Sequence, residues 1–390
     1  MGDTINILVV GAGAVGAFYA SRLQHHLFPP HSPNKTSISL VCRSNYSAVL
    51  NSGFTLKTRP FGDYTFRPDG VFRTCDDAAN SGVRWDYILV ATKSLVQLSA
   101  DGTNPRPASM AAADLIAPAV TPAHTAVVLI QNGVGIETPY RQRFPANPIL
   151  SAVTVIAAAQ TEPGVVVHHR WMRIAIGPYT DSVDGSESHD STGRDTLSAT
   201  RTSSLVDLFK LGGVTDAEQH TSRNIQIVRW HKLGLNAAFN PSSVLAGSRP
   251  TYELLVDADA REHCEAVMAE VFHAAKIIFK LDAFPPQSHP ESAFPTLSPS
   301  ATREYPKLAT IHEIIESSLR NKTFKSSMVL DWESQREMEV EVILGNAVKI
   351  AKRFAVQGMG RVQGMYALLK LAEKARVENA GDARKEKSSL

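Results

Sequence analysis

Three polar side chains that could do chemistry recur every four residues in the segment HKLGLNAAFNP: Lys232, Asn236 and Asn240. Residues four apart drift by only about 40° around an α-helix, so the three form one row on one face. The residues between them are mostly apolar, and an ammonium and two carboxamides are costly to bury without partners. The row therefore either lines a pocket or lies on the solvated face of an amphipathic helix.

A second chemical feature is a GxGxxG motif that follows an apolar strand pattern and opens a helical one. It consists of Gly11, Ala12, Gly13, Ala14, Val15 and Gly16. In such a motif the first glycine permits a tight turn, the second lets the backbone approach a pyrophosphate, and the third lets helix and strand pack closely. The helix N–H groups face the anion. The motif predicts dinucleotide binding, and a purely structural glycine turn is the alternative.

The end of the second predicted strand bears on the choice of cofactor. A carboxylate there would bind the ribose 2′-hydroxyl of NAD, but the sequence has Cys42, Arg43 and Ser44. The guanidinium of Arg43 offers several donors to a 2′-phosphate, and the Ser44 hydroxyl adds one more. We therefore expect NADP rather than NAD, unless Arg43 is simply a surface residue.

Two loops follow further predicted strands and should reach the same cleft, since ligands bind beyond the carboxyl ends of such strands. One is residues 91–94 with Lys93, and the other is residues 131–135 with Asn132. Asn132 could bond a nicotinamide amide or a substrate oxygen. Asn-Gly is also a common turn, so plain turn chemistry is the alternative.

These residues need a scaffold, and the pattern indicates an α/β fold. Apolar strands alternate with helical segments, which predicts a doubly wound parallel sheet of Rossmann type. The predicted strands are residues 5–10, 37–42, 86–91 and 126–130. After about residue 215 long helical patterns dominate, at 257–280 and 331–355.

The chain of 390 residues is too long for one simple core. We expect an NADP-binding domain over residues 1–215 and a mostly α-helical substrate domain over 216–390. We predict that residues 179–201 form a disordered insertion and that residues 284–306 form a Pro/Ser-rich insertion. A Pro-rich joint at 28–33 lengthens one connection, and the last dozen residues read as a charged, frayed tail.

Composition excludes several classes. The net charge of +2 gives no reason to expect a nucleic acid or an anionic membrane as partner. The three cysteines are widely spaced, which indicates neither a disulfide framework nor a metal site and favours a reducing, cytoplasmic compartment. No apolar run is long enough to cross a membrane. The helical half is compatible with a homodimer, and the terminal Ser-Ser-Leu lacks the lysine of a peroxisomal address.

In this order the motifs resemble those of the ketopantoate reductase (2-dehydropantoate 2-reductase) family, within the 6-phosphogluconate dehydrogenase-like group. The matching segments are GAGAVG at 11–16, CRS at 42–44, ATKS at 91–94, QNGVG at 131–135, KLGLNAAFNP at 232–241 and SSMVLDWESQREMEVEVILG at 326–345. The resemblance implies reduction of a 2-keto acid to the (R)-2-hydroxy acid with hydride from NADPH, in pantothenate biosynthesis.

The resemblance also implies residue roles. Lys232 matches the catalytic lysine and Glu339 the active-site glutamate. Asn236, Asn240 and Ser327 match substrate-binding residues, and Asn132 matches the asparagine of the cofactor loop. Three positions depart from the family pattern.

Phe324 replaces an asparagine that binds substrate hydroxyls, Gln335 replaces a glycine and Met338 replaces a threonine. A phenyl ring has no hydrogen-bonding capacity. Either the loop is displaced, or the 2-keto acid is less polar than ketopantoate.

Chemically, Lys232 can stabilise the charge that develops on the keto oxygen and also release a proton, which arginine cannot do near neutral pH. Glu339 suits a positioning role. The alternatives are a related enzyme that reduces another 2-keto acid or oxidises a hydroxy acid or an amino acid, and a non-catalytic NADP-binding sensor or scaffold.

Overall fold

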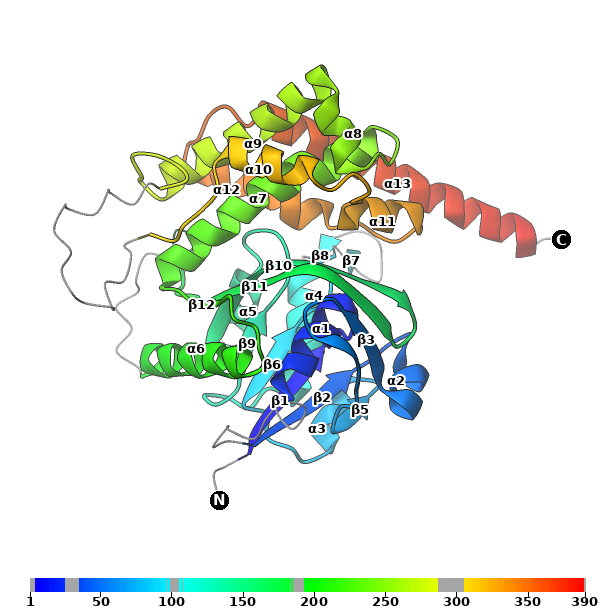
Figure 1. Ribbon diagram of the computed structural model, residues 1–390, viewed down its shortest axis with the longest axis vertical. Coiled ribbons are helices and arrows are strands. Elements are labelled where there is room, and N and C mark those ends of the chain that lie inside the picture. Colours follow the sequence, from blue (N-terminus) through cyan, green and yellow to red (C-terminus); the bar gives the residue numbers. More distant parts are fainter. Residues whose placement is uncertain are drawn as a thin grey trace. The chain divides into compact units, whose positions relative to one another are not determined.

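The structure, a computed structural model, is shown in Figure 1. It describes residues 4–24, 35–95, 97–98, 105–106, 108–182, 184, 193–286 and 305–388. They form two compact units, one drawn from Met1–Gln131 and Ile136–Gln226, the other from Asn132–Gly135 and Ile227–Leu390. The division falls after Gln226 and not near residue 215, because Ala217–Gln219 forms strand β12, which pairs with β11 (Val165–Pro178) of the first unit. The segment Asn132–Gly135, expected in the first domain, belongs to the helical unit.

The first unit is built on a ten-stranded sheet. Its parallel part has the order β5-β2-β1-β6-β9-β10, so the chain winds outward from β1 in both directions. These strands are β1 (Ile5–Val10), β2 (Thr36–Val41), β5 (Gly70–Phe72), β6 (Tyr87–Val90), β9 (Ala126–Leu129) and β10 (Ile149–Glu162). Every residue of β6 and β9 is buried, as expected for parallel strands with both faces covered. The predicted doubly wound fold is confirmed.

The carboxyl ends of the central strands are level with one another. Val10 pairs with Val41 on one side and with Val90 on the other. Val90 in turn pairs with Leu129. The segments that follow these four residues, beginning at residues 11, 42, 91 and 130, therefore leave the sheet at one edge.

Antiparallel strands, which the sequence analysis did not predict, extend the sheet. β10 and β11 form a long hairpin whose turn contains Gly164 at φ +82°. β11 pairs in parallel with β3 (Phe54–Thr58), and β3 forms a hairpin with β4 (Gly62–Phe66). The Ala-rich middle of β10 lacks the strict alternation of apolar and polar residues that marks a half-buried strand. A separate ribbon pairs β7 (Gln97–Leu98) with β8 (Pro105–Arg106).

Helices flank this sheet. They are α1 (Ala14–Leu23), α2 (Tyr46–Ser52), α3 (Cys75–Asn80), α4 (Ala108–Ile116) with the 3₁₀ turn Ala117–Ala119, α5 (Thr138–Arg143) and α6 (Arg194–Leu211). α1 and α6 pack against each other and on β11, with Phe18, Tyr19 and Phe209 buried in the core. Residues 194–201, expected to be disordered, form the first turns of α6. They are ordered because Ser198 and Thr202 are buried on the side of α6 that packs inward.

The second unit is helical. Its elements are α7 (Ser222–Leu245), α8 (Thr251–Val256), α9 (Ala258–Ile278), α10 (Ile311–Leu319), α11 (Ser327–Glu333), the π-helical turn η3 (Glu341–Gly345), α12 (Asn346–Arg353) and α13 (Gly360–Ser388). The predicted helix at 257–280 corresponds to α9, and the row of polar residues lies on α7. No described helix is both long and apolar enough to span a bilayer.

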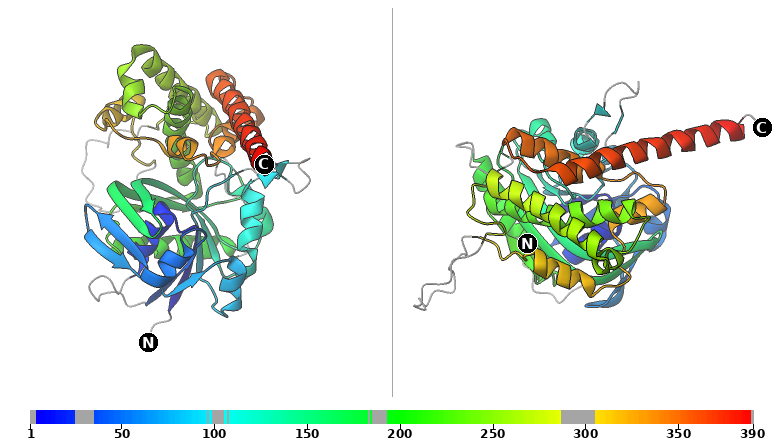
Figure 2. Two further views of the ribbon diagram at one scale, coloured as in Figure 1. Left: turned by 90° about the vertical axis from the view of Figure 1, so that its right-hand side faces the viewer. Right: turned by 90° about the horizontal axis from the view of Figure 1, so that it is seen from above.

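Two helical predictions are wrong in this unit. The segment 331–355 is not one helix: α11 ends at Glu333, Gln335 has φ +54°, and the helix resumes only at Val340 before η3. The charged tail, predicted to be frayed, is helical as far as Ser388, where α13 ends, and residues 389–390 lie outside the described residues; Figure 2 shows α13 as one long red helix. The joint at 28–33, residues 183 and 185–192 of the first insertion and 287–304 of the second lie outside the described residues.

Candidate active site

The glycine-rich run forms the turn between β1 and α1. Gly11 has φ +100°, which residues with side chains rarely adopt. A Cβ on Gly11 would lie 2.6 Å from the Thr92 nitrogen, and one on Gly16 would lie 2.2 Å from the Gly11 carbonyl oxygen. Ala14 and Val15 form the first turn of α1. The first and third glycines therefore serve close packing.

Gly13 serves a different purpose, because a Cβ there would meet nothing within 4 Å. The space above it is open at the N-terminus of α1, whose first turn carries no acidic side chain. Amide N–H groups at a helix start attract an anion. Asn45, which the sequence analysis missed, donates from Nδ2 to the Ala12 carbonyl oxygen at 2.7 Å and holds the turn in shape. The turn fits the pyrophosphate of a dinucleotide.

Two predicted cationic residues follow strands that end at the same edge of the sheet. The Gly11 nitrogen donates to the Val41 carbonyl oxygen at 3.4 Å, so Arg43 begins close to the glycine turn. Arg43 and Lys93 are both exposed.

Gln131 couples the loops after β6 and β9. Its Nε2 donates to the Thr92 carbonyl oxygen at 2.8 Å, and its Oε1 accepts from the buried Tyr140 hydroxyl at 3.3 Å. The next residue is Asn132, where the chain enters the second unit. Two polar contacts thus fix the side chain of Gln131 in the first unit.

In the second unit Lys232, Asn132 and Glu339 form one hydrogen-bonded group, which we call the lysine cluster. Lys232 Nζ donates to Asn132 Oδ1 at 2.8 Å, and Asn132 Nδ2 donates to Glu339 Oε2 at 3.1 Å. An ammonium only donates and a carboxylate only accepts, so the amide of Asn132 can bridge them in this orientation alone. Glu339 is buried and Lys232 is half-buried.

The pKa of Lys232 is lowered to about 8, first because burial disfavours the charged form and second because the guanidinium of Arg229 is near. The carboxylate of Glu339 acts in the opposite direction and raises this pKa. Lys232 is therefore an ammonium at neutral pH that gives up its proton far more readily than an exposed lysine does.

The backbone that carries Asn132 is held tightly. Gly133 has φ +87°, and a Cβ there would lie 2.4 Å from the Val342 carbonyl oxygen. That oxygen accepts from the Val134 nitrogen at 3.0 Å, and Asn346 Nδ2 donates to the Val134 carbonyl oxygen at 2.9 Å. On α7, Arg229 Nη1 donates to the Gly133 carbonyl oxygen at 3.0 Å. The sequence analysis missed Arg229, which reads locally as one more polar residue of the helix.

The two glutamates near residue 340 have different partners. Glu339 immediately precedes the helix that contains η3 and bonds Asn132, whereas Glu341 lies in η3. Glu341 accepts from the Tyr366 hydroxyl at 2.6 Å and pairs with Lys349. A Cβ on Gly345 would lie 2.8 Å from the Glu341 carboxylate, so this glycine makes room for it. Only Glu339 belongs to the lysine cluster.

The other predicted residues do not join the cluster by hydrogen bonds within the described part of the chain. Asn236 is half-buried and Asn240 buried, and neither amide makes a side-chain hydrogen bond to a described residue. Ser327 is exposed and is the first residue of α11. The cap of α11 is Ser326, whose Oγ accepts from the Val329 nitrogen. Phe324 is 40% exposed.

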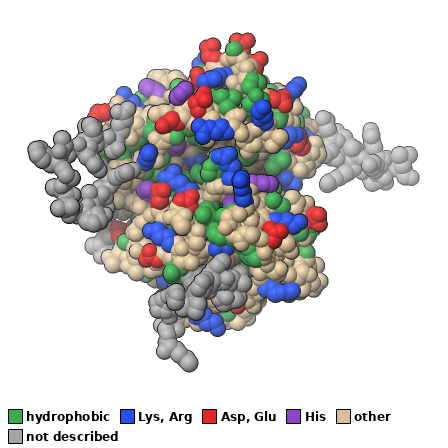
Figure 3. Space-filling model, in the orientation of Figure 1, with side chains coloured by type: hydrophobic (Ala, Val, Ile, Leu, Met, Phe, Trp, Pro, Cys, Tyr) green, Lys and Arg blue, Asp and Glu red, His purple; other side chains and the backbone are tan. Residues whose placement is uncertain are grey.

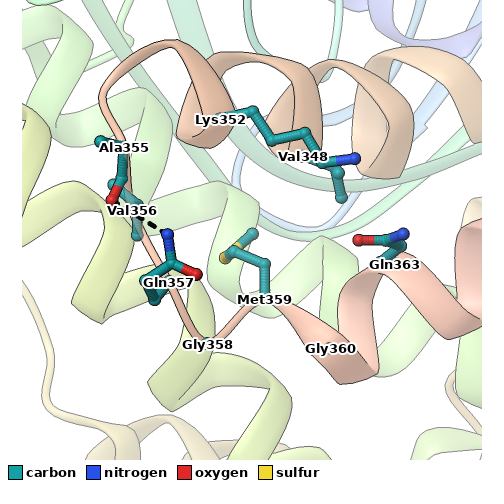
Figure 4. Close-up of a pocket in the computed structure, with 9 residues that line it drawn as sticks. All are labelled: Val348, Lys352, Ala355, Val356, Gln357, Gly358, Met359, Gly360 and Gln363. Carbon is teal, nitrogen blue, oxygen red and sulfur yellow. Dashed lines mark hydrogen bonds between the residues drawn. The ribbon is translucent and has the colours of Figure 1, made fainter.

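A separate cavity of about 400 Å³ lies where α12 passes into α13. Its polar side chains are Lys352, Gln357 and Gln363, and Figure 4 shows Gln357 bonded back to the Ala355 carbonyl oxygen. It contains no member of the lysine cluster and no acidic group. Among the described residues no three His, Cys, Asp or Glu side chains are grouped to hold a metal ion. The face shown in Figure 3 has cationic and anionic side chains interspersed.

A doubly wound sheet with a dinucleotide turn, together with an ammonium of lowered pKa, defines an NAD(P)-dependent oxidoreductase. The comparisons agree. The family model for the ketopantoate reductase PanE/ApbA matches residues 7–181, and the model for the C-terminal part of that family matches residues 224–373. The protein belongs to the ketopantoate reductase family.

Individual relatives match over nearly the whole length. A solved 2-dehydropantoate 2-reductase from Methylococcus capsulatus is 30% identical, with 95% of this chain and 98% of that chain covered and a TM-score of 0.68. An uncharacterised protein of Saccharomyces cerevisiae is 27% identical over 96% of this chain and 95% of its own length. D-mandelate dehydrogenase, solved with NADH and anilino(oxo)acetate, shares the fold at 16% identity, with 95% and 99% covered and a TM-score of 0.66.

Proposed function

We propose that this protein reduces a 2-keto acid to the (R)-2-hydroxy acid with NADPH as hydride donor, and that the keto acid is 2-dehydropantoate. The observation that carries the proposal is the lysine cluster, in which a half-buried ammonium with a lowered pKa is bonded through Asn132 to the buried Glu339. The match to the Methylococcus capsulatus enzyme supports the substrate. Formation of pantoate would place the protein in the cytoplasmic pathway to pantothenate and coenzyme A.

The residues of the first unit suit NADPH. The open space above Gly13 would admit the pyrophosphate, and the N–H groups at the start of α1 would bind it. Arg43 would hold the 2′-phosphate, and Lys93 would add a second cation from the neighbouring loop. When bound, the nicotinamide supplies the hydride.

In the reduction, negative charge develops on the keto oxygen of the substrate. The ammonium of Lys232 stabilises that charge and transfers one proton from Nζ to the oxygen, which completes the hydroxyl group. A second N–H of Lys232 remains bonded to Asn132, so Nζ keeps its position during the transfer. Glu339 fixes the Asn132 amide and thereby acts through Asn132.

Substrate binding would come from the rest of the row on α7 and from α11. Asn236 and Asn240 have amide groups that no described residue engages, so both can bond a ligand. The exposed hydroxyl of Ser327 would donate to the carboxylate of the keto acid. Together these residues recognise the two ends of a small 2-keto acid.

The rate of reduction should depend on pH through the protonation of Lys232. Reduction requires Lys232 as the ammonium, and its pKa is lowered to about 8. The protonated fraction is nearly complete at pH 6 to 7 and falls above pH 8, so kcat for reduction should fall by about tenfold per pH unit well above that value. Oxidation of the hydroxy acid needs the neutral amine and should show the opposite trend.

The test is NADPH oxidation by the purified protein with a panel of 2-keto acids, including 2-dehydropantoate, 2-ketoisovalerate and benzoylformate. We expect 2-dehydropantoate to give the highest kcat/KM and the product to be the (R)-hydroxy acid. An inert panel together with tight NADPH binding would contradict catalysis and favour a sensor. Turnover only of hydroxy acids with NADP⁺ would identify an oxidative enzyme. Light scattering in the same buffers would test whether the protein forms a homodimer.

A second candidate substrate is a 2-keto acid with an apolar or aromatic substituent. Phe324 and Met338 stand where the family pattern has asparagine and threonine, and the ring of Phe324 is 40% exposed. An exposed phenyl ring suits an apolar substituent better than the hydroxyl of ketopantoate. D-mandelate dehydrogenase shows that the fold accommodates an aromatic 2-hydroxy acid. Higher kcat/KM for benzoylformate than for 2-dehydropantoate would decide for this candidate.

A further inference from the structure

We infer that Arg229 is a positioning residue for Lys232: it holds the backbone beside Asn132 and places a permanent positive charge next to the lysine. This inference rests on the proposed function, because it assumes that Lys232 is the proton donor. Arg229 does not belong to the row Lys232, Asn236, Asn240, and no motif identified in the sequence includes it.

The guanidinium of Arg229 is buried. Arg229 is only 3% exposed, and a buried guanidinium is tolerated only with good hydrogen-bond partners. One of these partners is the Gly133 carbonyl oxygen, 3.0 Å from Nη1. A charge-assisted bond of this kind is stronger than a bond between neutral groups. The side chain therefore contributes more than packing.

The bond from Arg229 holds the segment that carries Asn132. The segment Asn132–Gly135 is bonded on one side to Val342 and Asn346, through the nitrogen and the carbonyl oxygen of Val134. Arg229 engages the same segment from α7, through the carbonyl oxygen of Gly133. The segment is thus held from two elements, and Asn132 is covalently next to the bonded peptide. Loss of Arg229 would release one side and let the Asn132 amide move away from Lys232.

Arg229 also places a second positive charge near Lys232. Arg229 and Lys232 are three residues apart on α7, so their side chains leave the same side of the helix. Two neighbouring cations repel, and the one that titrates more easily loses its proton first. Arginine keeps its proton at any pH that proteins tolerate, so the lysine must be the residue that responds. An arginine at this position directs the whole effect onto Nζ of Lys232.

The groups that act electrostatically on Lys232 come from different elements. Arg229 on α7 disfavours the ammonium, whereas Glu339, which precedes η3, favours it. Asn132 faces the ammonium as well but is neutral. Removal of Arg229 leaves Glu339 as the dominant charge, so the pKa of Lys232 should rise. Lys232 would then be a poorer proton donor near neutral pH.

The experiment measures the titration of Lys232 directly. Lysine labelled with ¹³C at Cε gives one NMR signal per residue, and the signal of Lys232 is assigned by its loss in Lys232→Met. We expect Arg229→Met to raise the pH at which Lys232 titrates by roughly one unit. Arg229→Lys keeps a positive charge and should shift the titration less. Arg249→Met is the control, since Arg249 is 63% exposed on the same unit, and should leave the titration unchanged.

Kinetics provide the second readout. In Arg229→Met the alkaline limb of kcat for reduction should move to higher pH, and kcat at neutral pH should fall about tenfold while KM for the keto acid changes little. An unchanged Lys232 titration in folded Arg229→Met would overturn the inference. If Arg229→Met does not fold, Arg229→Gln takes its place, because it removes the charge and keeps a hydrogen-bond donor; an unchanged titration in that variant would overturn the inference as well. If even the wild-type protein reduces no 2-keto acid, the proposed function fails, while the NMR titration still decides the role of Arg229.

Discussion

The glycine turn and the lysine cluster are two sites built on opposite principles. The turn binds through backbone groups of one continuous segment, Gly11–Gly16, and its shape depends on where a Cβ would or would not fit. The lysine cluster consists of three side chains, with Asn132 lying 100 residues before Lys232 and 207 before Glu339. A backbone site is encoded locally, whereas a side-chain site exists only once distant segments have packed. Substitutions should therefore separate cofactor binding from chemistry.

The largest expected effect is that of Lys232→Ala. It removes the ammonium that would donate a proton to the substrate oxygen, and Asn132 Oδ1 loses its bond to Nζ, so kcat should fall by roughly a hundred- to ten-thousandfold. The dissociation constant for NADPH, measured by fluorescence titration, should change by less than about twofold, because the glycine turn is untouched. Unchanged turnover in a folded Lys232→Ala protein would remove the basis of the proposed mechanism.

The converse effect is expected from Arg43→Asp. A carboxylate in place of the guanidinium would repel a 2′-phosphate and accept a bond from a ribose 2′-hydroxyl. The preference for NADPH over NADH, as the ratio of the two dissociation constants, should fall by about a hundredfold. kcat with saturating cofactor should stay close to that of the wild type. A preference that does not move would show that the 2′-phosphate is held elsewhere. Arg59→Asp, which also adds a negative charge at an exposed site, is the matched control.

Gly133→Ala tests whether the cluster depends on the backbone near Asn132. A Cβ at this residue would lie 2.4 Å from the Val342 carbonyl oxygen, and φ is +87°. The substitution should cost about 1–3 kcal/mol of unfolding free energy and lower kcat about tenfold, with little change in NADPH affinity. Chemical denaturation and steady-state kinetics give the two values. Gly364→Ala, with open space around the added methyl group, should leave kcat unchanged and should not lower the unfolding free energy, because alanine is favoured over glycine in a helix interior.

The smallest effect is expected from Tyr366→Phe, which distinguishes the two glutamates. The Tyr366 hydroxyl bonds Glu341 at 2.6 Å, so its loss should lower stability by about 1 kcal/mol. kcat should change by less than about twofold, because Glu341 is outside the lysine cluster. Glu339→Gln, in contrast, should lower kcat clearly, since it weakens the acceptor that orients Asn132. A large fall in kcat for Tyr366→Phe would mean that the position of Glu339 depends on the contact between Tyr366 and Glu341 in the π-helical turn.

The same distinction explains which predictions could be made in advance. The central strands were recognisable because four short apolar runs each stand between turn-forming residues, and the long patterns of α7 and α9 have clear helical periodicity. The hairpin of β10 and β11 was not recognised, because its residues are partly covered and lack strict alternation. The sequence predicts disorder at the start of α6, because its Ser and Thr residues have low helix propensity. They form a helix because Ser198 and Thr202 pack against the core.

The amino-acid sequence by itself determined the dinucleotide turn, the row on α7 and the family, because each depends on residues close together in the chain. Only the tertiary structure decided that Asn132 bridges Lys232 and Glu339, that Glu341 belongs to another contact, and that Arg229 grips the Gly133 peptide. These outcomes depend on which atoms meet after the helices pack. Spacing along the chain contains no information about a bond between residues a hundred or more positions apart.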